Sequence, residues 1–411
     1  MSCGPSVCQD CIEDPDLRDF IESAAFDTQC SFCGASDSDP IAALVTELAD
    51  YMRSCLAEYY DDAANHLPYI GKEGGSQGVH WDAYDLLVDE LEIGLPNDND
   101  DSLLRELTNC LGDQTWCEAA PFSLDENDRL RFSWEQFCEL IKHRRRFFFL
   151  SEHSSPHSEL LDPAALLETI SDFAQTIECI KTISAGSSLY RARYQDPGET
   201  LETAQELGPP PFKKAIQANR MSPPGIVMFY VAHDPETALR ETAIDPGDFV
   251  IGKFTTCRDA HILDLTGLPP VPGIFRSISD SLEYNPRRLL TFLHGIAEAI
   301  SEPIARDDRI HVNYVPTQVV TEFFRTLKLE DGTRLDGIRF SSTRHAGHSS
   351  LVLFADQGNL ALSSGDPGLA KPKSDRWIRL IGSETTHVTE GRLRSWAPDE
   401  AISEPSFAED G

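Results

Sequence analysis

The chain has 411 residues, of which 40% are hydrophobic and 25% are charged, so it is long enough for two or three globular domains. Its formal net charge of −33 disfavours nucleic acid and anionic membranes as main partners, because both would be repelled. No apolar run has membrane-spanning length, and the first residues lack the basic and apolar order of a signal peptide. We therefore expect a cytoplasmic protein, in which cysteines are thiols or metal ligands more often than disulfides.

Two C-x2-C pairs lie near the N-terminus: Cys8 with Cys11, and Cys30 with Cys33, with 18 residues between the pairs. This spacing is typical of a zinc site with four thiolates, in which each pair supplies two sulfurs from one tight turn. Four sulfurs complete the tetrahedron, so the predicted role of the zinc is structural. Two alternatives stay open: Cys3 could replace one ligand, or the four could be unrelated buried thiols.

The next part of the chain has helical patterns and ends at a serine-rich stretch, residues 151–158, where we expect a domain boundary. Asp39-Pro40 is the predicted cap of the first helix, and Ser133 with Gln136 has the pattern of a capping box for a later one. The predicted helices begin near residue 40, span 81–91 and 102–111, begin at 133, and run from 163 to about 180.

From residue 188 the chain is rich in short apolar, β-branched and aromatic runs, which predict strands. The expected strands are 188–194, 226–232, 249–256, 260–265, 336–340 and 350–355, with helices at 235–244, 286–301 and 316–327. This pattern predicts an α+β fold with a mixed sheet. The tail from Ser363 is rich in Pro, Ser and Gly; it could contain a short strand at 377–380, and we expect disorder after Ser395.

Five pieces of this region, in order, resemble the RES domain, the family named for its Arg, Glu and Ser. They cover about residues 185–360 and read Tyr190-Arg191-Ala192-Arg193, Asn219-Arg220 with Gly225, Tyr230-Val231-Ala232, Ala238-Leu239-Arg240-Glu241, and Gly337–Ser342 followed by Leu351-Val352-Leu353-Phe354. The sequence departs from the family at Met221-Ser222, where Trp-Asn is usual, and at Ser350, where Asn is frequent.

The resemblance implies a fold similar to the ADP-ribosyltransferase toxins and an activity that consumes NAD. Breaking the bond between nicotinamide and ribose passes through a transition state with oxocarbenium character, which a carboxylate stabilises. The resemblance assigns that carboxylate to Glu241 and the family's serine to Ser342, with Ser341 as second choice. Alternatively, Glu241 could cap a helix or pair with Arg240 or Arg191 at the surface.

The remaining NAD-binding residues follow from the same resemblance. Arg191 and Arg220 are the expected cations for the pyrophosphate, since a guanidinium binds phosphate in a bidentate way. Tyr230 is the expected aromatic face for nicotinamide, and Tyr190 the weaker candidate. Two alternatives stay open: Tyr230 could be plain core, and Arg193 could be confused with Arg191, because both would share one strand face.

The first third of the chain is similar to the N-terminal domain of the HEPN type that precedes some RES domains, judged from Asp14-Pro15-Asp16-Leu17 and Phe32-Cys33-Gly34. The expected domains are zinc knuckles at 1–36, a helical domain at 37–158, a RES-like domain at 162–362 and a tail at 363–411. The resemblance also raises an antitoxin or regulatory protein as partner. The alternatives are a catalytically dead NAD-binding or interaction module, and a ribonuclease that would use Arg146 and His153.

Overall fold

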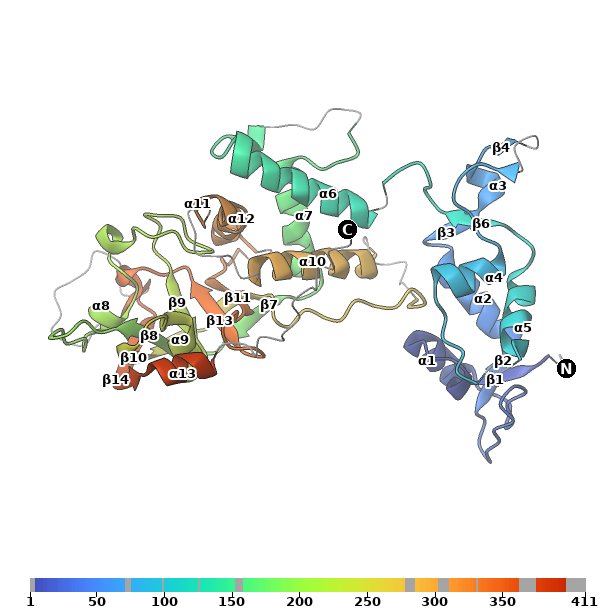
Figure 1. The fold of residues 1–411 in the computed structure, drawn as a ribbon, viewed down its shortest axis with the longest axis horizontal. Helices are drawn as coiled ribbons and strands as arrows, with labels where there is room; N and C mark the ends of the chain where they lie inside the picture. Colours follow the sequence, from blue (N-terminus) through green and yellow to red (C-terminus); the bar gives the residue numbers. More distant parts are fainter. Residues whose placement is uncertain are drawn as a thin grey trace, which may run out of the picture. The chain divides into compact units, whose positions relative to one another are not determined.

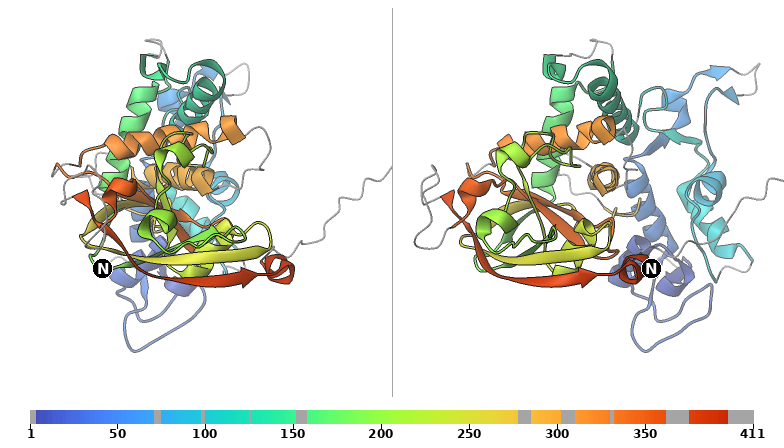
Figure 2. Two further views of the ribbon diagram at one scale, coloured as in Figure 1. Left: turned by 90° about the vertical axis from the view of Figure 1, so that its left-hand side faces the viewer. Right: turned by 60° about the vertical axis from the view of Figure 1, so that its left-hand side comes forward.

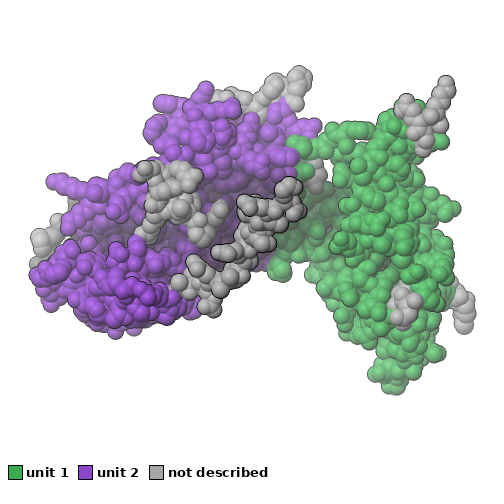
Figure 3. Space-filling model, in the orientation of Figure 1, with its two compact units in different colours: residues 1–130, 270–291 green, residues 131–269, 292–411 purple. Residues whose placement is uncertain are grey.

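The computed structural model describes residues 4–70, 75–97, 100–124, 126–151, 158–277, 285–301, 310–329, 332–361 and 375–396. Its contacts divide the chain into two compact units, coloured separately in Figure 3. Unit 1 comprises Met1–Leu130 with Pro270–Thr291, and unit 2 comprises Arg131–Pro269 with Phe292–Gly411. None of the described helices is long and apolar enough to cross a membrane.

In its described residues, unit 1 is built from short helices and three two-stranded sheets (Figure 1). Its elements are β1 (Ser6–Cys8), η1 (Gln9–Cys11), α1 (Pro15–Ala24), β2 (Ala42–Leu44), α2 (Val45–Leu56), β3 (Tyr60–Asp62), α3 (Ala63–His66), β4 (Tyr69–Ile70), β5 (Gly75–Ser76), α4 (Ala83–Asp85), η3 (Leu86–Glu90), α5 (Ser102–Leu111) and β6 (Trp116–Glu118). Asp14 caps α1 by accepting the Leu17 amide at 3.0 Å.

The sequence predicted two helix starts wrongly. Asp39 caps nothing, because Ala42–Leu44 pair with β1 as a strand and α2 begins only at Val45. The helix expected to begin at Ser133 begins at Glu126, and Ser133 is buried inside it. The Ser133 hydroxyl accepts the Leu161 amide at 2.9 Å, so its polar group serves a tertiary contact rather than a cap.

Unit 1 also contains a segment that lies late in the sequence, residues 270–291. Phe275 is buried in the same apolar cluster as Leu17, Ile21 and Met52. The Tyr51 hydroxyl donates to the Phe275 carbonyl at 2.8 Å, and Arg276 pairs with Asp16 at 3.1 Å. Part of the core of the N-terminal unit therefore comes from a segment in the second half of the sequence.

Unit 2 is organised around an eight-stranded sheet of order β14-β10-β8-β9-β13-β12-β11-β7. Among the described strands, β11 and β12 pair in parallel and the other neighbours pair antiparallel. The strands are β7 (Ile180–Ile183), β8 (Ser188–Tyr194), β9 (Phe229–Ala232), β10 (Gly247–Thr256), β11 (Ala260–Asp264), β12 (Gly337–Ser341), β13 (Ser349–Leu353) and β14 (Ile378–Val388). The predicted α+β fold with a mixed sheet is thereby confirmed.

Two helices start in unit 1 and continue into unit 2: α6 (Glu126–Glu139) and α10 (Pro286–Ser301). The other helices of unit 2 are η4 (Leu140–Arg144), η5 (Phe149–Ser151), α7 (Pro163–Thr176), α8 (Ala204–Leu207), η6 (Phe212–Lys214), α9 (Pro235–Thr242), α11 (Ile310–Asn313), α12 (Val315–Thr326), η7 (Gln357–Asn359) and α13 (Glu390–Ser395). Asp162 caps α7, as its Asp-Pro start predicts. Helix α7 ends at Thr176, and Ile180, expected in it, begins β7.

Strand β14 is much longer than the short strand expected at 377–380, because it pairs with β10 along its length, with one register irregularity between Lys253 and Phe254. Figure 2 shows the two long strands side by side. Expected disorder after Ser395 concerns residues that, apart from Trp396, lie outside the described ones. The contact division falls after Leu130, and the expected boundary at 151–158 partly lies outside the described residues, so the domain limits stay predictions.

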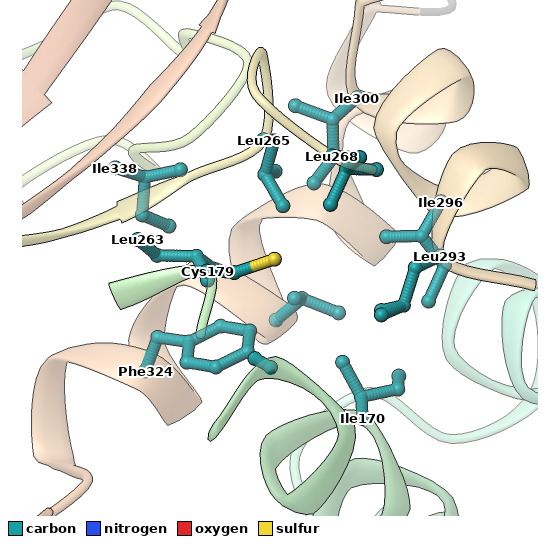
Figure 4. A pocket seen from close by; sticks show the side chains of 12 residues that line it. Ile170, Cys179, Leu263, Leu265, Leu268, Leu293, Ile296, Ile300, Phe324 and Ile338 are labelled. Carbon is teal, nitrogen blue, oxygen red and sulfur yellow. The ribbon is translucent and has the colours of Figure 1, made fainter. Parts of the chain in front are cut away.

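An apolar core lies where α7, α10 and α12 pack against β11 and β12 (Figure 4). It leaves a cavity of about 10 Å³, lined by Cys179 and eleven Ile, Leu, Ala, Val and Phe residues. That volume holds about one water molecule at most. Because this cavity offers no charged group, we do not assign the chemistry to it.

Candidate active site

Two predicted site residues, Glu241 and Ser342, meet directly. Ser342 follows β12, is 8% exposed, and its hydroxyl donates a hydrogen bond to Oε1 of Glu241. The same Ser342 oxygen accepts the backbone N–H groups of Arg344 at 3.3 Å and His345 at 3.1 Å. The two N–H groups occupy the lone pairs of the Ser342 oxygen, and its proton goes to Oε1 of Glu241. Among the described residues, Oε2 of Glu241 accepts no hydrogen bond.

Helix α9 positions Glu241. Asp234 caps the helix by accepting the Thr237 amide at 2.8 Å, and Pro235 occupies its first turn. Thr237 lies one turn before Glu241, and its hydroxyl hydrogen-bonds Nδ1 of His345 at 2.7 Å. Two contacts one turn apart thus hold the turn after β12 against one flank of α9.

Tyr230 and Arg220 form a second cluster, around the turn 219–222. The Tyr230 hydroxyl lies 3.0 Å from Oγ of Ser222 and accepts the Met221 amide at 3.3 Å. Burial raises the pKa of Tyr230 to about 12, so it stays a neutral phenol. Arg220 donates to the Ile300 carbonyl at the end of α10, and its guanidinium lies 5.9 Å from the centre of the Tyr314 ring.

Arg191 lies apart from these two clusters. It donates to the carbonyls of Leu207 and Gly208, at the end of α8, and its guanidinium lies 5.6 Å from the Phe229 ring. Burial, helped by the charge of Arg193, lowers the pKa of Arg191 to about 9, which still leaves a cation at neutral pH. Arg193 points to the same side and donates to the Glu206 carbonyl.

The strand register separates Arg191 from Glu241. Ala192 packs with Leu239 of α9, and consecutive side chains of a strand point to opposite faces. Arg191 therefore lies on the face of β8 opposite to α9. Tyr190 and Tyr230 lie on the α9 face, because Tyr190 is paired with Ala232, two residues after Tyr230.

Ser350 adds an unexpected feature to the α9 face. It is paired with Ala232 on one side and Phe340 on the other, and it is 6% exposed. Its hydroxyl has no hydrogen-bond partner among the described residues. A buried hydroxyl without a partner is costly, so this position marks either a defect or a group that a ligand satisfies.

The sequence analysis missed Thr237 and His345. Thr237 could have been found from helical spacing, since it precedes Glu241 by one turn on the same face. His345 carried no signal, because its approach to α9 depends on how β12 and β13 are joined.

A candidate metal centre lies in unit 1, where the sulfurs of Cys8, Cys11, Cys30 and Cys33 are all within 4.8 Å of one another. The neighbouring pairs are 3.8 Å (Cys8–Cys11), 3.5 Å (Cys8–Cys33) and 3.7 Å (Cys11–Cys30) apart. Zn–S bonds of about 2.3 Å in a tetrahedron place the sulfurs about 3.8 Å apart, so the donor set fits zinc. Cys3 lies outside the described residues.

The structure does not test the ribonuclease alternative, because only one of its two residues is described. Arg146 is exposed after η4, and His153 lies outside the described residues.

Comparison with known families assigns both halves of the chain. A family model for HEPN/RES N-terminal domain 1 matches residues 23–155, and a model for the RES domain matches residues 188–372. No curated protein matches the chain. The RES domain relates the chain to a toxin-like family linked to NAD. The chain is therefore a RES domain protein with a HEPN/RES-type N-terminal domain.

Proposed function

We propose that this protein cleaves the bond between nicotinamide and ribose in NAD, with Glu241 as the catalytic carboxylate. The observation that carries the proposal is the Glu241–Ser342 pair: a carboxylate of a RES domain, held by the hydroxyl of a buried serine. One carboxylate oxygen is engaged by Ser342, and the other is left to contact the ribose.

In the proposed reaction, the C1′–N bond breaks and its electron pair stays on the nicotinamide nitrogen. The ribose becomes an oxocarbenium-like species, which the negative charge of Glu241 stabilises. Water, phosphate or a protein side chain then adds to C1′ and loses a proton to solvent. These acceptors correspond to a glycohydrolase, a phosphorylase and an ADP-ribosyltransferase.

Arg220 is the better of the two proposed phosphate ligands. Arg220 lies on the turn 219–222, which the Tyr230 hydroxyl hydrogen-bonds. Tyr230 lies on the sheet face that α9 covers, as Glu241 does. We propose Arg191 as the second cation. Because it lies on the opposite face of the sheet from Glu241, the kinetic experiment below tests its role separately. Tyr230 is proposed to offer its ring to nicotinamide, with Tyr190 as the alternative.

The decisive test uses the full-length protein, because Phe275 of the RES region lies in the core of unit 1. Glu241→Gln keeps the shape and removes the charge, so nicotinamide release should fall by about 100-fold to 1,000-fold. Glu236→Gln is the matched control, since Glu236 lies on α9 but pairs with Arg240 and Arg392. Ser342→Ala should reduce release less than Glu241→Gln, because it removes a neutral hydrogen bond.

The two arginines are separated by kinetics. Arg220→Ala should raise KM for NAD with a smaller change in kcat, because phosphate contacts change little along the reaction. If Arg191 binds NAD, Arg191→Ala has the same effect; if it only holds the 207–208 turn, the variant loses stability instead. Absence of NAD binding and of release with all three acceptors would leave the inactive interaction module as the function.

We also propose that the four cysteines of unit 1 bind one structural zinc ion. A regulatory partner such as an antitoxin stays a prediction from the family.

A further inference from the structure

Three metal-ligating side chains converge outside the cysteine centre: Asp234, His345 and His348. Each offers one ligand atom within 4.8 Å of the other two. Asp234 caps α9, and the two histidines come from the turn between β12 and β13. The two imidazole rings are stacked, with centroids 3.6 Å apart and planes 5° from parallel.

The triad is held in place by contacts around it. The Thr237 hydroxyl is 2.6 Å from Oδ2 of Asp234 and 2.7 Å from Nδ1 of His345. This contact fixes the orientation of the His345 ring, as outer hydrogen bonds do for metal-binding histidines. Nδ1 of His348 lies 3.3 Å from Oδ2 of Asp234.

The turn itself is also constrained. The His348 carbonyl accepts the Ser342 amide at 2.9 Å, and the His348 amide donates to the His345 carbonyl at 3.1 Å. Gly347 lies in the turn with a φ of 76°, a backbone conformation that residues with a side chain rarely adopt. The backbone of the hairpin is therefore constrained, and the exposed His348 ring would turn out of its parallel stacking on His345 to direct a nitrogen at the same ion.

Helix capping alone does not account for this arrangement. A capping aspartate needs only the Thr237 amide, whereas here two imidazoles are also gathered beside the same carboxylate. An ordinary His–Asp pair serves for comparison: His387 and Asp248 are 2.7 Å apart, and no second histidine joins them to form a metal-ligand group among the described residues.

We propose that Asp234, His345 and His348 bind a divalent transition-metal ion of the zinc, cobalt and nickel class. Two imidazoles with one carboxylate suit these ions, whereas magnesium and calcium prefer oxygen ligands alone. The positive end of α9 opposes a cation, while the Asp234 carboxylate and the net charge of −33 favour one. Three protein ligands leave positions for water.

A bound ion would join the start of α9 to the turn that presents Ser342. Ser342 contacts both histidines, since its hydroxyl oxygen accepts the His345 amide and its amide donates to the His348 carbonyl. The metal would thus fix the same hairpin that directs the Ser342 hydroxyl to Glu241. The proposed metal site itself does not depend on NAD cleavage.

The test is a Co²⁺ titration of the full-length protein whose cysteine centre has first been filled with Zn²⁺. Wild type should bind one further Co²⁺ per chain, with visible d–d absorption and without the thiolate-to-cobalt charge transfer that the cysteine centre would give. His345→Ala and His348→Ala should each weaken this binding at least about tenfold, since outer partners alone are worth about 10-fold to 100-fold.

Two further variants sharpen the test. Thr237→Val removes the hydroxyl that bonds both Asp234 and His345 but keeps all three ligands, so it should weaken binding by about tenfold. His387→Ala removes a histidine of the comparison pair and should leave binding unchanged. His348 is exposed, so its replacement should keep the melting temperature of the metal-free protein. Equal Co²⁺ binding in wild type and His348→Ala, or no further Co²⁺ in wild type, overturns the proposal.

Discussion

Phe275 is expected to stabilise the N-terminal unit although it lies within the RES domain match, at 188–372. Its side chain is 2% exposed and packs in the cluster that contains Leu17 and Met52. An aromatic side chain buries about 150–250 Å², worth about 4–6 kcal/mol at about 25 cal/mol per Å². Phe275→Ala keeps the β-carbon, and losses of about 3–5 kcal/mol are typical of such changes, so we expect that range.

Hydrogen exchange of the full-length protein measures this loss locally. Amides of α2, at Val45–Leu56, should exchange about 100-fold to 5,000-fold faster, because each 1.4 kcal/mol is a factor of about ten. Amides of β13, at Ser349–Leu353, report on unit 2 and should be unchanged.

Val271→Ala provides the matched control from the same segment. Val271 is 37% exposed, so its truncation should change the free energy of unfolding by about 0.5 kcal/mol or less. The reasoning fails if Phe275→Ala accelerates exchange in α2 no more than Val271→Ala does. It also fails if the faster exchange is confined to β13.

Two further outcomes follow from buried polar groups. Burial raises the pKa of Cys8 to about 12 and raises the pKa of Cys11 as well, so both are protonated thiols at neutral pH without metal. Zinc binding should therefore release these protons, and the zinc affinity should rise with pH. Calorimetric titration in buffers of different ionisation enthalpy measures the proton release. Ser350→Ala should leave the free energy of unfolding in urea unchanged or raise it by up to about 1 kcal/mol, because the buried Ser350 hydroxyl has no partner among the described residues. A fall in the free energy of unfolding by more than about 1 kcal/mol would show that the hydroxyl has a partner. If Ser350 contacts NAD, the same variant should raise KM for NAD.

Local patterns in the sequence determined the elements with strong short-range signals. The strand at 188–194 and the helix at 102–111 have the predicted bounds, and the Asp-Pro starts of α7 and α9 cap their helices as expected. Alternation, caps and helix-ending glycines act within a few residues, so they can be recognised without knowledge of the fold.

The resemblance named Glu241 and Ser342 separately, and only the tertiary structure brings them into one hydrogen bond. It likewise named Arg191 beside Tyr190, whereas the register and the position of α9 decide that Arg191 lies on the opposite face from Glu241. A strand pattern predicts that neighbouring side chains alternate, but which face a helix covers depends on contacts distant in sequence.

The same physical reason explains the remaining differences. Ala42–Leu44 form a strand because β1 offers a pairing partner, which overrides the local signal for a helix. No local sequence pattern predicts the contacts of Phe275 or the grouping of Asp234, His345 and His348. Their neighbours come from segments far apart in the chain. Sequence determined which residues could do the chemistry, and long-range packing decided which of them lie together.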